Sequence, residues 1–137
     1  DNKVFNTVAV DSNDNVYCGG RDDKITKLDP DGNVQWSYAI SNDLFAVAID
    51  SSGNVYCGSR NGVVKKIDST GNEITSENWS SPKGNSRVYD ISIDDQGYLY
   101  IACGKVMKFD SSGNEILFNG ESLIEEISTD DIIISIG

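Results

Sequence analysis

Short runs in which apolar and polar residues alternate recur along the chain, separated by polar segments rich in Asp, Gly and Asn. Alternation with a period of two predicts half-buried β-strands, and no segment shows the sustained 3.6-residue period of an amphipathic helix. The first group has four such runs, at residues 4–10, 16–19, 24–28 and 34–38. Val and Ile number 26 against 11 for Ala, Leu and Met together, and branching at Cβ favours strands. The pattern predicts an all-β protein.

The same group of runs returns along the chain. Asn15-Val-Tyr-Cys-Gly-Gly-Arg21 matches Asn54-Val-Tyr-Cys-Gly-Ser-Arg60 at a shift of 39 residues. The segment from Lys27 to Asn33 returns at the same shift and appears once more as Lys108-Phe-Asp-Ser-Ser-Gly-Asn114. Short strands repeating with a period of about 40 residues indicate the blades of a β-propeller.

The repeat predicts a β-propeller of four-stranded antiparallel blades, of which about three and a half are present. A ring needs roughly four to eight blades, so this one would be incomplete. We expect the missing blades to belong to a longer polypeptide, with association of two copies as the alternative. The expected units are blade 1 at 1–43, blade 2 at 44–87, blade 3 at 88–122, and two strands of a fourth blade at 123–137.

An Asp opens the turn after the first strand and the turn after the third strand of each unit. Its carboxylate can accept a hydrogen bond from the backbone N–H two residues later, and the Gly or Asn that follows tolerates a positive φ. Asp11, Asn13 and Asn15 also match the first half of a Ca²⁺-binding loop, but Val16 and Asp22 stand where that loop needs Gly and Glu. We interpret these turns as structural and predict no metal or other cofactor.

The run from Asn15 to Asp23, continuing from Lys27 to Trp36, resembles the repeat of pyrroloquinoline-quinone-type β-propellers. That repeat has a Val-Tyr-x-Gly strand, an acidic or Asn-Gly turn, a strand ending in Leu-Asp, then a Gly turn and a Trp. The resemblance covers nearly the whole chain, with Thr75 and Leu117 at the Trp position of the second and third units. No residues match the quinone or Ca²⁺ site of the dehydrogenases, so the resemblance implies the non-enzymatic scaffold, surface and phage-tail members.

Charge and composition narrow the choice of partners and chemistry. Asp and Glu number 22 against 11 Lys and Arg, and this net charge of −11 argues against a nucleic-acid partner. No apolar run approaches the roughly 20 residues of a membrane-spanning helix. The chain has no His, so it lacks the commonest general base, and we predict that it is not an enzyme. Three cysteines form no disulfide framework and no signal peptide is visible, which leaves the cytoplasm and a virion or cell surface as compartments.

A basic residue follows the second strand of each unit, namely Arg21, Arg60 and Lys105. At equivalent places in successive blades they would lie on one face, as a partial ring of cations for an anionic or glycan partner. The alternative is that they offset the carboxylates of adjacent turns.

An insertion at 76–87 breaks the repeat and contains Trp79, Lys83 and Arg87. Loops that depart from a scaffold often carry binding residues, and an exposed Trp there would stack on a sugar ring. The leading hypothesis is therefore a non-catalytic propeller module, a protein-interaction or structural scaffold in a cell-surface or virion tail assembly. A carbohydrate-binding propeller and a fragment of a quinone- or metal-dependent enzyme are the alternatives. The expected partners are a protein, the remaining blades, a second copy or a glycan.

Overall fold

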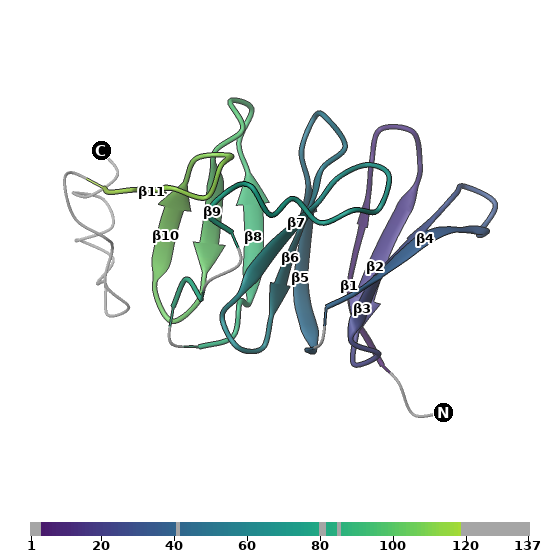
Figure 1. Ribbon diagram of the computed structural model, residues 1–137, viewed down its shortest axis with the longest axis horizontal. Helices are drawn as coiled ribbons and strands as arrows, with labels where there is room; N and C mark the ends of the chain where they lie inside the picture. The colour runs from purple at the N-terminus through teal and green to yellow at the C-terminus, as the bar shows by residue number, and fades with distance from the viewer. Residues whose placement is uncertain (1–3, 41, 80–81, 85, 119–137) are drawn as a thin grey trace, which may run out of the picture.

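Three antiparallel β-sheets stand side by side along the long axis of the molecule (Figure 1). This computed structural model describes residues 4–40, 42–79, 82–84 and 86–118. These residues include no helix, and hence none that is long and apolar enough to cross a membrane. The all-β class predicted from the period-two pattern is confirmed.

Strands that follow one another in the sequence are neighbours in each sheet, so every sheet is a simple up-and-down meander. The first strands of the three sheets, β1, β5 and β8, pack in succession along the molecule. The first sheet contains β1 (Phe5–Val10), β2 (Val16–Gly20), β3 (Lys24–Leu28) and β4 (Val34–Ala39). The second contains β5 (Leu44–Ile49), β6 (Val55–Ser59) and β7 (Val64–Ile67). The third contains β8 (Asp90–Ile93), β9 (Leu99–Ala102), β10 (Val106–Phe109) and β11 (Glu115–Ile116).

The second sheet has three strands where the repeat predicts four, and this prediction is wrong. In the described part of the segment after β7, two isolated bridges replace a strand. One joins Ile67 of β7 to Glu73, and the other joins Val63, just before β7, to Pro82. The insertion makes this segment too long to return as one straight strand, and Pro82 has no N–H to donate to a ladder. The expected strands at 123–137 lie outside the described residues.

The Asp-containing turns form as predicted. One Oδ of Asp11 accepts the backbone N–H groups of Asn13 and Asn15 at 2.9 and 3.0 Å, and the other accepts the Tyr17 hydroxyl at 2.8 Å. Burial alone would raise the pKa of Asp11, but the hydrogen bonds from Asn15, Tyr17 and the backbone outweigh it and lower that pKa to about 2. The same two backbone bonds form at Asp29, Asp50, Asp68, Asp94 and Asp110.

Two apolar layers hold the sheets together, one in each space between neighbouring sheets. In both layers, one sheet contributes a buried Tyr of its second strand, and the next sheet contributes branched or aromatic residues of its second and third strands. Burial of such side chains is the main favourable term in folding. The layer between the first and second sheets contains Tyr17, Ile25, Ile40, Leu44, Val55, Cys57 and Ile67. The layer between the second and third contains Tyr56, Val64, Trp79, Val88, Leu99, Ile101, Met107 and Phe109.

Candidate functional site

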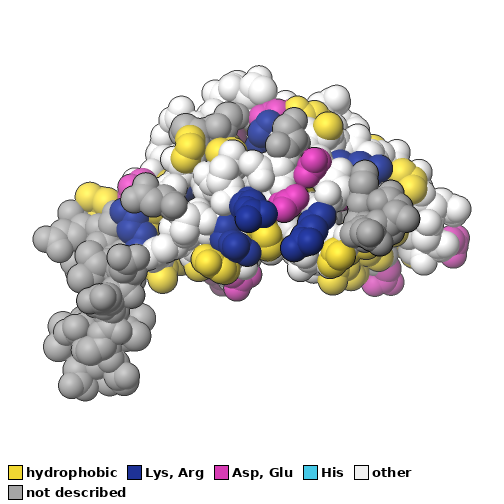
Figure 2. Space-filling model, turned by 90° about the horizontal axis from the view of Figure 1, so that it is seen from below, with side chains coloured by type: hydrophobic (Ala, Val, Ile, Leu, Met, Phe, Trp, Pro, Cys, Tyr) yellow, Lys and Arg dark blue, Asp and Glu magenta, His cyan; other side chains and the backbone are white. Residues whose placement is uncertain are grey.

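The turns after the second strand of each sheet lie at one end of the molecule, with the segments that lead into β5 and β8 (Figure 1). We call this end the loop face. Figure 2 views it directly and shows Lys and Arg side chains gathered near its middle, with acidic and hydrophobic side chains beside them. Arg21, Arg60 and Lys105 lie in these turns, at the equivalent places that the repeat predicts.

The three turn cations have different surroundings. Arg60 is exposed and pairs with Asp43 at 3.3 Å, and its backbone N–H donates to the Asp43 carbonyl at 2.9 Å. An exposed pair of this kind adds little stability, but it fixes the segment before β5. Arg21 is exposed and forms no ion pair with the described residues. Lys105 is half-buried in the turn between β9 and β10. Arg60 therefore fits the carboxylate-offsetting alternative, and Arg21 does not.

Arg87 stacks on two aromatic rings at the entrance to β8. Its guanidinium carbon lies 4.5 Å from the centre of the Phe45 ring and 5.5 Å from that of Tyr89. The Val88 N–H donates to the Ser59 carbonyl at 3.0 Å, which places Arg87 beside the turn that carries Arg60. The guanidinium makes no ion pair with the described residues, so its N–H groups are held in place without a carboxylate.

Phe45 and Tyr89 were missed from the sequence. Each stands two residues before the repeated element that begins at Val47 in the second unit and at Ile91 in the third. An aromatic residue at the same repeat position in two neighbouring units, with Arg87 two residues before Tyr89, was the available signal. Tyr89 is 61% exposed, so its ring is accessible on the loop face.

Lys83 does not join this group. Its ammonium lies over the rings of Trp79 and Phe109, 5.4 and 5.5 Å from their centres, and donates a hydrogen bond to the Asn78 carbonyl. Burial lowers the pKa of this ammonium. Lys83 therefore packs between the second and third sheets, although the sequence placed it in a binding loop.

The expectation that Trp79 is exposed for stacking on a ligand is wrong, because this side chain is 0% exposed. Its ring packs edge-on against Tyr56 at 5.5 Å and tilted against Phe109 at 5.7 Å. Its indole N–H donates to the Ser111 carbonyl at 3.1 Å, as that of Trp36 does to Ser69. Trp79 thus takes the place in the second unit that the sequence repeat assigned to Thr75.

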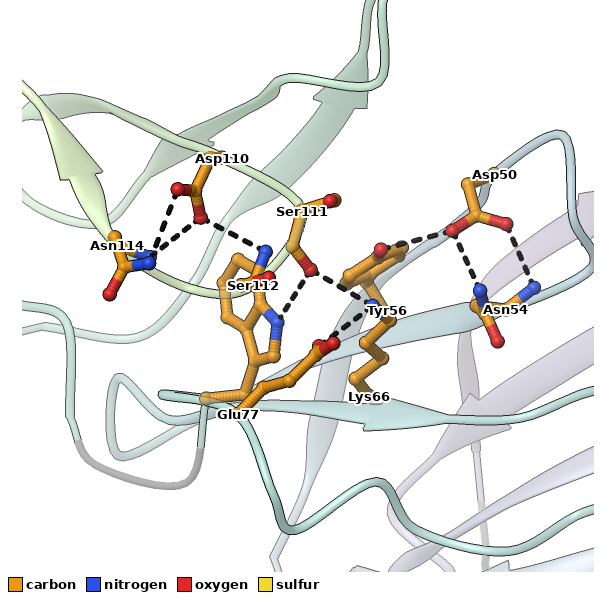
Figure 3. A network of polar contacts seen from close by, with 10 residues as sticks. Asp50, Asn54, Tyr56, Lys66, Glu77, Asp110, Ser111, Ser112 and Asn114 are labelled. Carbon is orange, nitrogen blue, oxygen red and sulfur yellow. Dashed lines mark hydrogen bonds and ion pairs between the residues drawn. The ribbon is translucent and has the colours of Figure 1, made fainter.

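Lys66 and the half-buried Glu77 form an ion pair beside Ser111 (Figure 3), whose carbonyl also accepts the Trp79 indole N–H. The Lys66 ammonium donates to Glu77 at 2.8 Å and to the Ser111 carbonyl at 2.9 Å, and it lies 5.4 Å from the centre of the Tyr56 ring. Lys66 itself is buried. A buried charge needs such partners, and this network braces the second sheet against the third.

Metal-ligating clusters and reactive thiols are not features of the described residues. These residues contain no cluster of three or more metal-ligating side chains. Cys57 and Cys103 are buried, and burial raises the pKa of both thiols, which disfavours the nucleophilic thiolate. The side chains on the loop face are suited to binding, through guanidinium groups and an exposed aromatic ring.

No protein-family model matches this sequence, and no curated protein matches it. Solved structures do match. A crystal structure of a protein of unknown function from Bacteroides caccae matches with a TM-score of 0.63 and 12% identity, covering 93% of this chain and 48% of that one. A streptogramin B lyase gives 0.67 and 15%, covering 80% and 38%. A catalytically inactive His-to-Ala variant of virginiamycin B lyase from Staphylococcus aureus, with quinupristin, gives 0.69 and 16%, covering 83% and 40%.

The similar structures are propeller proteins, and the chain spans less than half the length of each of these three. The prediction of a non-catalytic scaffold module is contradicted, because streptogramin B and virginiamycin B lyases are enzymes that share this fold. The error has a simple cause. The absence of His in 137 residues was applied to a whole protein, whereas a propeller site is assembled from several blades.

Proposed function

We propose that this chain supplies three successive blades of a ligand-binding β-propeller, and that the loop face around Arg87 binds an anionic group of the ligand. The ring is supported by the ordered packing of β1, β5 and β8 and by the similarity to propeller proteins. The tryptophan contacts to Ser69 and Ser111 support the resemblance to pyrroloquinoline-quinone-type repeats.

The stacked guanidinium of Arg87 is the observation that carries the proposal. Its central carbon lies over the rings of Phe45 and Tyr89, and no carboxylate of the described residues forms an ion pair with it in a chain whose net charge is −11. A planar guanidinium held in this way presents paired N–H donors, which match the two oxygens of a carboxylate or phosphate. The exposed Tyr89 ring adds an apolar surface for the rest of the ligand.

The similar lyases bear on catalysis as well. One of them is described as inactive once a histidine is replaced, and the present 137 residues contain no histidine. We therefore assign ligand binding, and no proton transfer by a histidine, to these three blades.

Benzoate, an aromatic carboxylate, is a suitable probe, with neutral benzamide as its matched control. We expect benzoate to shift the NMR signals of Arg87 and Tyr89 in a saturable way, and benzamide to leave them unchanged. Arg87→Ala should abolish the saturable shift. Lys27→Ala should not, because Lys27 lies over the Tyr17 ring at 5.6 Å in the first sheet, away from Arg87. Equal shifts with both probes, or loss of binding in both variants, would overturn the proposal.

A further inference from the structure

Two of three equivalent turns hold a tryptophan from the preceding unit. These turns join the third and fourth strand positions of each unit, at residues 29–32, 68–71 and 110–113. The indole N–H of Trp36 donates to the carbonyl of the second residue of one turn, and that of Trp79 does so in the next, both at 3.1 Å. In the first turn the equivalent carbonyl belongs to Pro30, and it accepts no hydrogen bond from the residues that the structure describes.

The last residue of each turn shows the same difference. A Cβ on Gly71 would lie 2.8 Å from the Trp36 ring, and one on Gly113 would lie 3.0 Å from the Trp79 ring. A Cβ on Gly32 would meet no atom within 4 Å. All three glycines have φ between 87° and 94°, so the first turn already has the backbone of a turn that holds an indole. It lacks only the indole.

The sheet face beside the empty turn is also uncovered. In the second and third sheets, the residues equivalent to Val16 are Val55 and Leu99, and both are fully buried under the preceding sheet. Val16 itself is only half-buried. On the same face of the first sheet, Val8 and Val10 are 66% and 58% exposed. A contiguous apolar face of this kind marks an interface.

We propose that this face and the turn at 29–32 dock one further blade of the same repeat type. That blade presents a tyrosine and a tryptophan at the positions of Tyr17 and Trp36, with the indole N–H donating to the Pro30 carbonyl. The two occupied turns supply the template for this partner. A second copy of the chain fits less well, because Trp36 and Trp79 are both engaged and the equivalent position in the third sheet holds Leu117.

The inference rests on the proposed ring, but its test needs no ligand, so its failure is distinguishable from a failure to bind benzoate. In the test chain, an added copy of residues 1–43 takes the place of residues 1–4 and is followed directly by Phe5. Equivalent positions in the added and original units are then 39 residues apart, as in the natural repeat. Cys18 of the original first sheet is the reporter, because it lies on the uncovered face while Cys57 and Cys103 are buried. The added copy carries Cys18→Ser, so that one accessible thiol remains.

We expect iodoacetamide to alkylate Cys18 at least about tenfold more slowly in the extended chain than in the original chain, because the added blade covers it. In the extended chain, Gly32→Asn in the original first sheet places a side chain where the indole of the added blade should lie. Asn tolerates the positive φ, so this variant should restore fast alkylation. Gly97→Asn is the matched control, since Gly97 has φ 89° and equally open surroundings, and alkylation should stay slow.

Equal alkylation rates in the extended and original chains would overturn the inference, as would equal effects of the two Asn variants. Slow alkylation in the original chain that strengthens with protein concentration would identify a second copy as the occupant, and would likewise overturn it.

Discussion

Replacement of Trp79 by Ala tests whether the irregular segment after β7 carries part of the core. The indole is fully buried, contacts Tyr56 and Phe109, and donates a hydrogen bond to the Ser111 carbonyl. Truncating a buried Trp to Ala costs about 3–5 kcal/mol, through lost burial and the cavity that remains. Domains of this size are stable by about 5–15 kcal/mol, so the variant should lose a large part of its free energy of unfolding.

Trp36→Ala is the matched control, because Trp36 makes the equivalent hydrogen bond at the neighbouring interface but is only half-buried. Its loss should be smaller, about 1–2 kcal/mol. Urea titration followed by circular dichroism gives both values. Trp79→Phe, which keeps a ring and removes the N–H donor, should fall between wild type and Trp79→Ala. If Trp79→Ala loses less than Trp36→Ala, the assignment of Trp79 to the core is refuted.

Two further outcomes follow from the turns. The pKa of Asp11 lies near 2 in the folded chain, below its ordinary value of 3.8, so its stabilising contribution is complete above about pH 4 and is lost as the pH falls toward 2. Melting temperatures across this range should decline less steeply with acid for Asp11→Asn than for wild type. An unchanged slope would count against a stabilising role of the Asp11 carboxylate. Gly71→Ala should cost about 1–3 kcal/mol more than Gly97→Ala in urea titrations, because both strain a positive φ but only the first collides with Trp36. Equal losses would mean that the indole moves aside.

The strands and turns were predictable because their signals are local and recur. Alternation defines a strand within a few residues, and an Asp followed by Gly and Asn defines a turn within five. Each unit repeats these signals, so the hydrogen bond that Asp11 accepts from the N–H two positions later follows from the pattern, and the bond from Asn15 is added by the structure. The prediction of a fourth strand in the second sheet failed because the insertion disrupts the period there.

The place of Trp79 could not be read from the repeat, because four extra residues move it beyond Thr75, the position that the period assigns. Its burial depends on Tyr56 and Phe109, which lie on two different sheets. The stacking of Arg87 is non-local for the same reason, since Phe45 is 42 residues away along the chain. The repeat position was enough to select the candidate Arg and Lys residues. The residues that they contact could be identified only from the packed structure.

The irregular segment beside β7 also affects how the molecule resists aggregation. An outer strand exposes backbone groups that can recruit a strand from another molecule. Beside β7 the irregular segment covers part of this edge, because the Lys66 carbonyl accepts the Ile74 N–H at 2.8 Å and Pro82, which has no N–H, stands opposite Val63 just before β7. β4 is the outer strand of the first sheet, has six residues and no charge, and begins with the exposed Val34. Intermolecular strand addition should therefore start at β4 of the first sheet, while the second sheet is protected by the segment that broke its repeat.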